Sequence, residues 1–469
     1  MPDRYDVVIL GAGPGGEVAV NTLLKAGKRI ALVEQELIGG ECTNWGCIPS
    51  KTLLRPPDLK GQSARAAGVG EPRLDFRRLA EYRDYMVSNH DDSRAIARYE
   101  GRGVTVVKAP GTIAGAGRVE ADGHVLEADA IIVATGAEAV IPPIPGLQDA
   151  GFWTNREATE ITELPETAVF IGGGVVSIEL AQFLARFGVA CTIVGPSLGA
   201  REEPAIGERL GEILEEDGVS LRIGPRAEAV RAENGRKVVT LDSGDELRGD
   251  VLVVATGRRP RTQGFGLENV GIEPGPRGIA IDERCRAGDG VWAIGDCTGT
   301  AQFTHVAKYQ ARVASADILG RPARADYRAV PRVIFTDPEV AAVGLTEAAA
   351  REQGIDAVSA VIDLPTTIAR PYTYQENPKG TFGVVADRER SIVVGAWAVA
   401  PLAGEWIHQA VLAIRAEIPI AVLTDTIVQF PTFSEAFGLA LRALPDEALL
   451  TGVDHCAHPM IEQPLAEVT

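Results

Sequence analysis

Short apolar runs rich in valine and isoleucine recur along the chain, and several of them end in a glycine turn. The first run, residues 6–10, leads into Gly11-Ala12-Gly13-Pro14-Gly15-Gly16 and then into an apolar helix that ends near Gly27. A second strand, residues 29–33, ends at Glu34. This order predicts a dinucleotide-binding βαβ unit, because glycines let the backbone approach a pyrophosphate and an acid at this spacing binds ribose hydroxyls.

The same pattern appears a second time. A strand at residues 169–171 leads into Gly172-Gly173-Gly174-Val175-Val176-Ser177, and a helix through Glu179 follows. Ser177 stands where a third glycine is usual, and a small residue still permits close helix packing. Both units also end in Ala-Thr-Gly, with Thr135 and Gly136 in the first and Gly257 in the second. Two such units predict two dinucleotide-binding sites in one chain.

Breaks in this pattern divide the chain. The proline-rich residues 142–146 form a stiff crossover, which we interpret as a domain boundary, and another strand ends in Gly295-Asp296. From Pro331 we expect antiparallel strands and then a helix over 405–417. The expected strands lie near 358–363, 381–387 and 391–399. We predict an α/β fold with two Rossmann-like domains and a C-terminal α+β domain. The predicted segments are 1–150, 151–257, 258–330 and 331–469.

The composition argues against several classes of partner and location. The 469 residues carry a net charge of −18, which disfavours nucleic acid and anionic membranes because both are polyanions. No apolar run approaches the roughly 18 residues that span a bilayer. The first residues lack the basic start of a signal peptide. Six cysteines are too few for a secreted disulfide scaffold of this length, so we expect a cytoplasmic enzyme.

The candidate chemistry lies in Gly39-Gly40-Glu41-Cys42-Thr43-Asn44-Trp45-Gly46-Cys47-Ile48-Pro49-Ser50-Lys51. The two cysteines can close a small disulfide ring, and Pro49 suits the first turn of a helix that begins at Cys47. The helix N-terminus and Lys51 favour a thiolate, so we predict Cys47 as the low-pKa thiol and Cys42 as the more exposed, exchanging one. The alternatives are two ordinary buried thiols or half of a zinc site, although no second ligand pair follows at zinc spacing.

This stretch resembles the active-site signature of the flavin-dependent pyridine nucleotide–disulfide oxidoreductases, which include dihydrolipoamide dehydrogenase, glutathione reductase and mercuric reductase. The resemblance extends over nearly the whole chain. It implies that the first dinucleotide unit binds FAD, that the second binds NADPH or NADH, and that Cys42 and Cys47 form a redox disulfide. It also implies an ion pair between Lys51 and Glu179 beside the flavin, and a homodimer formed through the C-terminal domain.

The resemblance assigns the turn at Gly295-Asp296 to the flavin as well. Asp296 would accept hydrogen bonds from the ribityl chain, and the alternative is a structural turn aspartate. Residues 303–307 begin a helix whose N-terminal amides would stabilise negative charge on the reduced flavin. His305 at this helix start is a candidate cofactor contact rather than a catalytic base, and the alternative is a capping residue.

The sequence leaves the choice of nicotinamide open. The strand 192–194 is followed by Gly195-Pro196-Ser197, with no acid to hold a free 2′-hydroxyl and repel a phosphate. Arg201 lies within reach of a 2′-phosphate, although the neighbouring Glu202 and Glu203 can neutralise it. These residues favour NADPH only slightly.

The chain departs from its relatives at one position. Their C-terminal domain carries His-Pro-Thr-x-Ser-Glu, in which the histidine is the acid–base partner of the exchanging thiol and the glutamate orients it. Here Phe430 replaces the histidine, while Glu435 is retained. A phenyl ring cannot move a proton, and loss of the base slows exchange by roughly 10²–10⁴-fold. Tyr372 and Tyr374 are other candidate proton donors.

Three classes of small-molecule acceptor follow. The intact cysteine pair favours a disulfide substrate, and a quinone needs only a reduced flavin. The tail His455-Cys456-Ala457-His458 favours a metal ion, because mercuric reductases carry a cysteine pair in a similar tail. The alternative for this tail is a surface segment with coincidental histidines. A flavin-bearing redox sensor is the non-enzymatic alternative.

Overall fold

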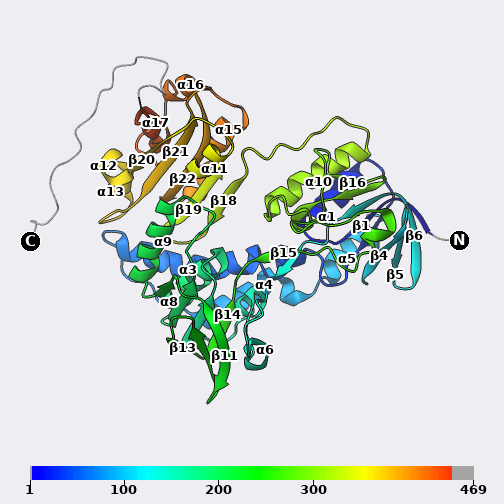
Figure 1. Cartoon of the computed structure of the whole chain (residues 1–469), viewed down its shortest axis with the longest axis horizontal. Coiled ribbons are helices and arrows are strands. Elements are labelled where there is room, and N and C mark those ends of the chain that lie inside the picture. Colours follow the sequence, from blue (N-terminus) through cyan, green and yellow to red (C-terminus); the bar gives the residue numbers. More distant parts are fainter. Residues whose placement is uncertain (1–2, 446–469) are drawn as a thin grey trace, which may run out of the picture.

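The computed structural model describes residues 3–445, which form three α/β regions along the chain (Figure 1). The N-terminal region is built on an eight-stranded sheet of order β16-β17-β6-β1-β2-β3, with β4 and β5 joined beside β6. Its strands are β1 (Asp3–Leu10), β2 (Ile30–Val33), β3 (Thr105–Val107), β4 (Gly111–Gly115), β5 (Arg118–Ala121), β6 (His124–Val133), β16 (Arg286–Gly288) and β17 (Val291–Ala293).

Helices cover this sheet because its central strands are buried on both faces. Residues 7–10 of β1 are fully buried and run parallel to both β2 and β6. Two helices, α1 and α10, lie side by side over one face (Figure 1). The helices and 3₁₀ turns of this region are α1 (Pro14–Lys25), α2 (Gly40–Asn44), α3 (Cys47–Arg65), α4 (Phe76–Met86), η1 (Ser88–His90), α5 (Ser93–Glu100), η2 (Leu267–Val270), η3 (Gly295–Thr298) and α10 (Thr304–Ile318).

The middle region repeats the plan on a smaller scale. A parallel sheet of order β10-β9-β8-β14 lies beside an antiparallel sheet of β11, β12 and β13. The strands β7 (Ala137–Ala139) and β15 (Arg258–Pro260) pair with each other and carry the chain into and out of this region. Its other elements are α6 (Leu147–Ala150), α7 (Asn155–Thr159), β8 (Thr167–Ile171), α8 (Val175–Arg186), β9 (Ala190–Gly195), α9 (Pro204–Glu216), β10 (Ser220–Ile223), β11 (Ala227–Glu233), β12 (Arg236–Leu241), β13 (Glu246–Gly249) and β14 (Val251–Val254).

The C-terminal region is an antiparallel sheet of order β18-β19-β22-β21-β20 with helices packed against it. The helix expected over 405–417 is divided in the structure into α14 and α15, which correct its bounds. The elements are β18 (Pro331–Ile334), β19 (Glu339–Gly344), α11 (Glu347–Glu352), β20 (Ala357–Asp363), α12 (Leu364–Thr367), α13 (Arg370–Tyr374), β21 (Thr381–Asp387), β22 (Ile392–Ala400), α14 (Ala403–Trp406), α15 (His408–Arg415), α16 (Ile420–Thr424) and α17 (Glu435–Arg442).

These sheets confirm the predicted α/β class, and the exact domain bounds stay a prediction. The tail with His455, Cys456 and His458 lies outside the described residues. None of the helices within residues 3–445 has the length and apolar composition needed to cross a bilayer.

A buried arginine joins the three regions. Arg186, at the end of α8, has a side chain only 6% exposed and pairs with Asp58 of α3, Asp217 after α9 and Asp337 before β19, at 3.2, 3.0 and 3.1 Å. Burial and the nearby Asp337 raise the pKa of Asp58 to about 8, so this carboxyl is mostly protonated at neutral pH. Arg186 therefore carries the charge opposite Asp217 and shares Asp337 with Arg65 of α3, which lies 2.7 Å from that acid.

Loss of this arginine is expected to destabilise the chain. Arg186→Met leaves Asp217 without its cation, while Asp337 keeps its pair with Arg65 at 2.7 Å, so we expect a loss below the about 3–5 kcal/mol of a fully broken buried pair. Arg209→Met is the matched control, because Arg209 pairs with Glu212 on the surface of α9 and such pairs contribute less than about 1 kcal/mol. Denaturant unfolding of both variants measures the difference. Equal stability of the two would contradict a joining role for Arg186.

Candidate active site

A cavity of about 1540 Å³ is lined by residues of all three regions. It brings together most of the residues singled out from the sequence. Those that line it are Gly11, Gly13, Gly15, Glu34, Cys42, Cys47, Lys51, Thr135, Gly136, Gly172, Gly174, Glu179, Gly257, Gly295, Asp296 and His305. Gly16, Ser177 and Glu435 lie outside its lining.

The first glycine turn fits a dinucleotide. Gly11 has φ +104°, and a Cβ there would lie 2.3 Å from the carbonyl oxygen of Ala134. A Cβ at Gly16 would lie 2.0 Å from the oxygen of Gly11, so Gly16 serves close packing of α1 on the turn. Gly13 has open space where a Cβ would project, on the cavity side. The bare backbone at the N-terminus of α1 therefore fits a pyrophosphate.

The acid at the end of β2 is held in place by the backbone. Glu34 is buried, and its Oε2 accepts from the amide of Ala12 while its Oε1 accepts from the amide of Glu36, both at 2.7 Å. Each oxygen keeps a further lone pair, and the residue lines the cavity. These features suit the binding of ribose hydroxyls.

The second glycine turn has the same construction. Gly172 has φ +114°, and a Cβ there would lie 2.4 Å from the oxygen of Ala255, which matches the contact of Gly11 with Ala134. Gly173 packs as closely on Ser197. Ser177 is fully buried inside α8, and within residues 3–445 its hydroxyl has no hydrogen-bond partner. Ser177 thus serves helix packing rather than contact with a ligand.

The two cysteines meet where α2 packs against α3. Both are thiols in the structure. The neighbouring Cys42 thiol lowers the pKa of Cys47 to about 6, with help from the hydroxyl of Thr304, 3.6 Å from Cys47 Sγ, and from the charge of Lys51. The interaction with Cys47 raises the pKa of Cys42 in turn. The predicted low-pKa role of Cys47 agrees with this geometry.

The predicted order of exposure is wrong. Cys47 is exposed and Cys42 half-buried in this chain. The two cysteines differ in position. Cys47 is the first residue of α3, whereas Cys42 lies inside α2, which begins at Gly40. A Cβ at Gly40 would lie 2.8 Å from Cα of Gly13, so the cysteine loop rests directly on this turn.

Lys51 and Glu179 form the expected ion pair. Lys51 Nζ donates to Glu179 Oε2 at 2.7 Å, and the other oxygen of Glu179 accepts from the amide of Phe335 at 2.9 Å. The ammonium also lies 4.8 Å from the centre of the Phe335 ring. Because the Glu179 side chain is only 4% exposed, each of its oxygens needs such a partner. The pair connects α3, α8 and the C-terminal region beside Cys47.

Asp296 and His305 face the cavity from the return segment. Burial raises the pKa of Asp296 to about 6, against the opposing charge of Arg258. His305, in the first turn of α10, stacks on Phe303 with ring centres 5.2 Å apart. Partial burial lowers the pKa of its imidazole, so His305 is neutral at pH 7.

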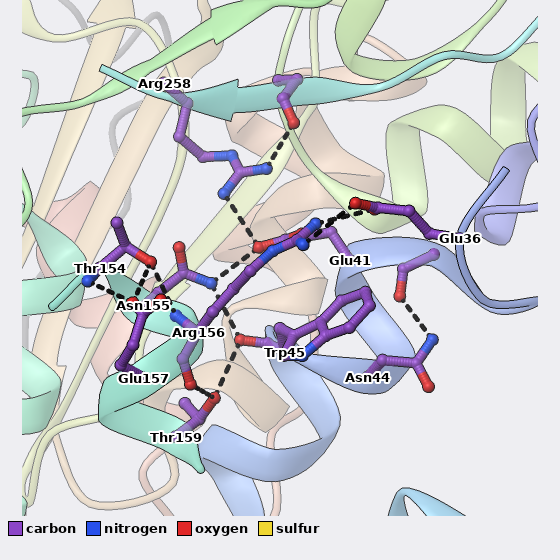
Figure 2. A network of polar contacts seen from close by, with 12 residues as sticks. Glu36, Glu41, Asn44, Trp45, Thr154, Asn155, Arg156, Glu157, Thr159 and Arg258 are labelled. Carbon is purple, nitrogen blue, oxygen red and sulfur yellow. Dashed lines mark hydrogen bonds and ion pairs between the residues drawn. The ribbon is translucent and has the colours of Figure 1, made fainter. Parts of the chain in front are cut away.

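Sequence reasoning missed a charged cluster in the same wall, shown in Figure 2. Arg156 of α7 pairs with Glu36 at 3.0 Å and with Glu41 at 2.7 Å, and Arg258 lies 3.6 Å from Glu41. All four residues line the cavity. No local motif signals this cluster, because Arg156 is 115 residues from Glu41 along the chain.

The position of the missing histidine lies on the surface of this chain. Phe430 is 74% exposed, and Oε2 of Glu435 accepts from the amide of Thr432 at 2.9 Å. Tyr374 packs against Phe433 with ring centres 5.6 Å apart, and Tyr372 is exposed. None of these groups lines the cavity, so this chain alone places none of them beside the cysteines.

Comparisons with known proteins agree with this arrangement. A family profile described as "Pyridine nucleotide-disulphide oxidoreductase" matches residues 5–311, and the dimerisation domain of that family matches residues 330–441. This chain belongs to the pyridine nucleotide–disulphide oxidoreductases. A mercuric reductase of Staphylococcus aureus is 30% identical to it over 465 residues, which cover 97% of this chain and 84% of that protein.

Two further relatives widen the comparison. A dihydrolipoyl dehydrogenase of Thermus scotoductus is 33% identical over 462 residues, covering 95% of this chain and 98% of that protein. A structure of the Cu(II) complex of the HOCl-induced flavoprotein disulfide reductase RclA from Escherichia coli has a TM-score of 0.83 at 27% identity, covering 94% of this chain and 99% of that one. Oxidoreductases of this family depend on FAD and use NAD(P)H as electron donor, which confirms the predicted enzyme class. The dimerisation domain supports the predicted homodimer.

The acidity of Cys47 has a measurable consequence. Alkylation of the reduced oxidoreductase by iodoacetamide follows the thiolate, so its rate should be half-maximal near pH 6 and fall at lower pH. Lys51→Met removes a charge that favours the thiolate, and the half-maximal pH should therefore rise. Lys60→Met is the control, because Lys60 lies on the same helix and pairs with Glu71 instead. An unchanged profile in Lys51→Met would show that the charge of Lys51 does not reach the thiol.

Proposed function

We propose that this oxidoreductase takes two electrons from NADPH, uses them to reduce a Cys42–Cys47 disulfide, and passes them on to a thiophilic metal ion. The observation that carries the proposal is the shared cavity, which joins both glycine turns to the cysteine pair. Cys47, with a pKa of about 6, is a thiolate at neutral pH and hence a soft ligand.

The residues of the cavity divide the work between two nucleotides. Gly11, Gly13 and Gly15 with Glu34 would hold the ADP half of FAD, with Gly16 supporting the turn. Asp296, Thr135, Gly136 and Gly295 would meet its ribityl and phosphate groups, and His305 its ring. FAD, when bound, supplies the two-electron carrier between nicotinamide and the cysteines. Gly172, Gly174 and Gly257 would hold the nicotinamide nucleotide, with Ser177 supporting the helix.

The proposed reaction balances with the cysteine pair as the intermediate carrier. The disulfide, NADPH and one proton give the dithiol and NADP⁺, and Lys51 stabilises the Cys47 thiolate that forms. The dithiol then returns to the disulfide. Its two electrons reduce one Hg(II) to Hg(0) or two Cu(II) to two Cu(I), and two protons are released. Glu179 keeps Lys51 in place during both steps.

The choice of NADPH is supported by two arginines at the end of the second nucleotide site. Arg201, Arg226 and Ser197 all line the cavity. The neighbouring acids do not neutralise Arg201, because both oxygens of Glu202 accept from Arg332 at 2.8 Å and Glu203 accepts from the amide of Glu347. Within residues 3–445 neither arginine side chain has a carboxylate partner. Free guanidinium groups suit a 2′-phosphate.

Both arginines are expected to set the nucleotide preference. Arg201→Met and Arg226→Met should each lower kcat/KM for NADPH by about 10–100-fold, the effect of a lost hydrogen bond to a charged group, and leave NADH nearly unchanged. Arg222→Met is the control, because Arg222 is exposed on β10 and does not line the cavity. Steady-state kinetics with both nucleotides measure the ratio. Equal losses for NADPH and NADH would exclude a contact with the 2′-phosphate.

The metal acceptor is supported by the departure at Phe430 and by the relatives. Release of a disulfide substrate requires protonation of a leaving thiolate, whereas reduction of a bound cation does not. Several relatives are named mercuric reductases, and RclA was solved as a Cu(II) complex. Within residues 3–445 no three His, Cys, Asp or Glu side chains form a metal cluster, so the two thiols themselves would bind the ion.

The acceptor assignment predicts a specific pattern of turnover. Anaerobic NADPH oxidation by the FAD-loaded enzyme should be faster with Hg(II) or Cu(II) as acceptor than with glutathione disulfide or lipoamide. Cys42→Ser should abolish the metal-dependent rate and preserve reduction of a quinone, which needs no thiol. Comparable quinone and metal rates in Cys42→Ser would contradict a thiol-bound metal.

Restoring the histidine at position 430 tests the same assignment from the side of the disulfide substrate. Phe430→His should raise turnover of glutathione disulfide by at least about tenfold, since a base at this position contributes roughly 10²–10⁴-fold. Phe430→Leu removes the ring without adding a base and should leave disulfide turnover low. Efficient turnover of the disulfide by the natural chain would point to a different proton donor and favour a disulfide substrate.

A further inference from the structure

The short helix α7 belongs to the middle region and contacts the cysteine loop, residues 39–47. At its start, Trp153 extends the middle sheet: its amide donates to Leu252 at 2.7 Å, and Val254 donates to its carbonyl at 2.8 Å. Thr154 then caps α7 in a capping box with Glu157. The helix is therefore anchored to β14 on one side and presents its side chains to the cysteine loop on the other.

One carboxylate of the cysteine loop is held by three residues from outside it. Glu41, which directly precedes Cys42, accepts from Nη2 and Nε of Arg156 at 2.7 and 3.1 Å and from Nδ2 of Asn155 at 2.8 Å (Figure 2). Arg258 lies 3.6 Å away on its other side. Burial alone would raise the pKa of Glu41, but Arg156 and Asn155 lower it, so the carboxylate stays charged.

The same helix also holds the middle of the loop. The guanidinium of Arg156 lies 4.0 Å from the centre of the Trp45 ring. The carbonyl of Trp45 accepts from Asn155 at 3.0 Å and from Thr159 at 3.3 Å. Its indole Nε1 donates to Glu160 at 2.7 Å. Positions 41 and 45 are thus both fixed, one residue before Cys42 and two residues before Cys47.

Arginine is required for this arrangement. Arg156 pairs with Glu36 through Nη1 and Nη2 at 3.2 and 3.0 Å while it also binds Glu41 and stacks on Trp45. The two carboxylates raise its pKa against the effect of burial, so the cluster is fully charged. A planar guanidinium with five donors can satisfy two carboxylates and a ring at once, whereas a lysine ammonium cannot.

We propose that Arg156 is a positioning residue that fixes the cysteine loop through Glu41 and Trp45, and thereby holds the Cys47 sulfur against the cofactor side of the cavity. This inference rests on the proposed redox role of Cys42 and Cys47. The pair alternates between a bonded and an open form, and each form must present Cys47 at the same place. Misplacement of reacting groups by about 1 Å costs on the order of 100-fold in rate.

The test uses the FAD-loaded enzyme and a spectroscopic signal of the thiolate. After two-electron reduction, Cys47 in contact with oxidised flavin gives a long-wavelength charge-transfer absorbance. Arg156→Met should weaken this band and slow reduction of the disulfide by NADPH by about 10–100-fold. Arg156→Lys should recover only part of both. Arg231→Met is the matched control, because Arg231 also pairs with two glutamates, Glu233 and Glu246, but on the surface of β11.

The outcomes separate this inference from the function on which it rests. A natural enzyme without the band would refute the redox role of the pair, whatever Arg156 does. A natural enzyme with the band, and Arg156→Met with the same band and rate as Arg231→Met, would refute the positioning role. If Arg156→Met does not retain FAD, Asn155→Ala removes one bond to Glu41 and one to Trp45 and should weaken the band in the same direction.

A double-mutant cycle shows the route of the effect. If Arg156 acts through Glu41, then Arg156→Met should change the band less in a Glu41→Gln background than in the natural chain. Glu233→Gln removes a carboxylate partner of the surface control Arg231 and should leave the band intact. Full additivity of Arg156→Met with Glu41→Gln would overturn the proposed route.

Discussion

The ion pair between Lys51 and Glu179 is the interaction on which the site depends. Glu179 is almost completely buried, so its charge is tolerated only because Lys51 and the amide of Phe335 meet its two oxygens. These three residues come from α3, α8 and the C-terminal region. The contact therefore fixes the helix that begins at Cys47 relative to both other regions, and it places a positive charge where the thiolate forms.

The two proposed nucleotide sites share one local structure, a glycine turn followed by a helix. In each, a glycine at positive φ lies where a Cβ would be only 2.3 or 2.4 Å from the carbonyl oxygen of the alanine in Ala-Thr-Gly, and a helix begins soon afterwards. The cysteine loop is added only to the first, where Gly40 packs on Gly13. This asymmetry supports the proposal that the first site holds FAD beside the thiols and the second holds the nicotinamide nucleotide.

The C-terminal region carries the features that the single chain leaves exposed. Ile427 is 97% exposed and Phe430 74%, which is unusual for apolar side chains and fits the family's dimerisation domain. Glu435, retained from the motif of the relatives, bonds the amide of Thr432 and thus has a structural use without the histidine. The chain can therefore keep Glu435 for this structural contact although Phe430 has replaced the histidine.

Much of this protein follows from local sequence. The glycine turns, the helix start at Cys47 and strands such as β21 depend on neighbouring residues, so the fold class and most cavity residues were predictable. The Lys51–Glu179 pair was expected from the family resemblance, but the other charge partners could not be read from the sequence. Arg156 finds Glu41 115 residues away, and Arg332 takes Glu202 from 130 residues away, which frees Arg201. Which acid meets which base depends on how distant segments pack, and only the tertiary structure decides that.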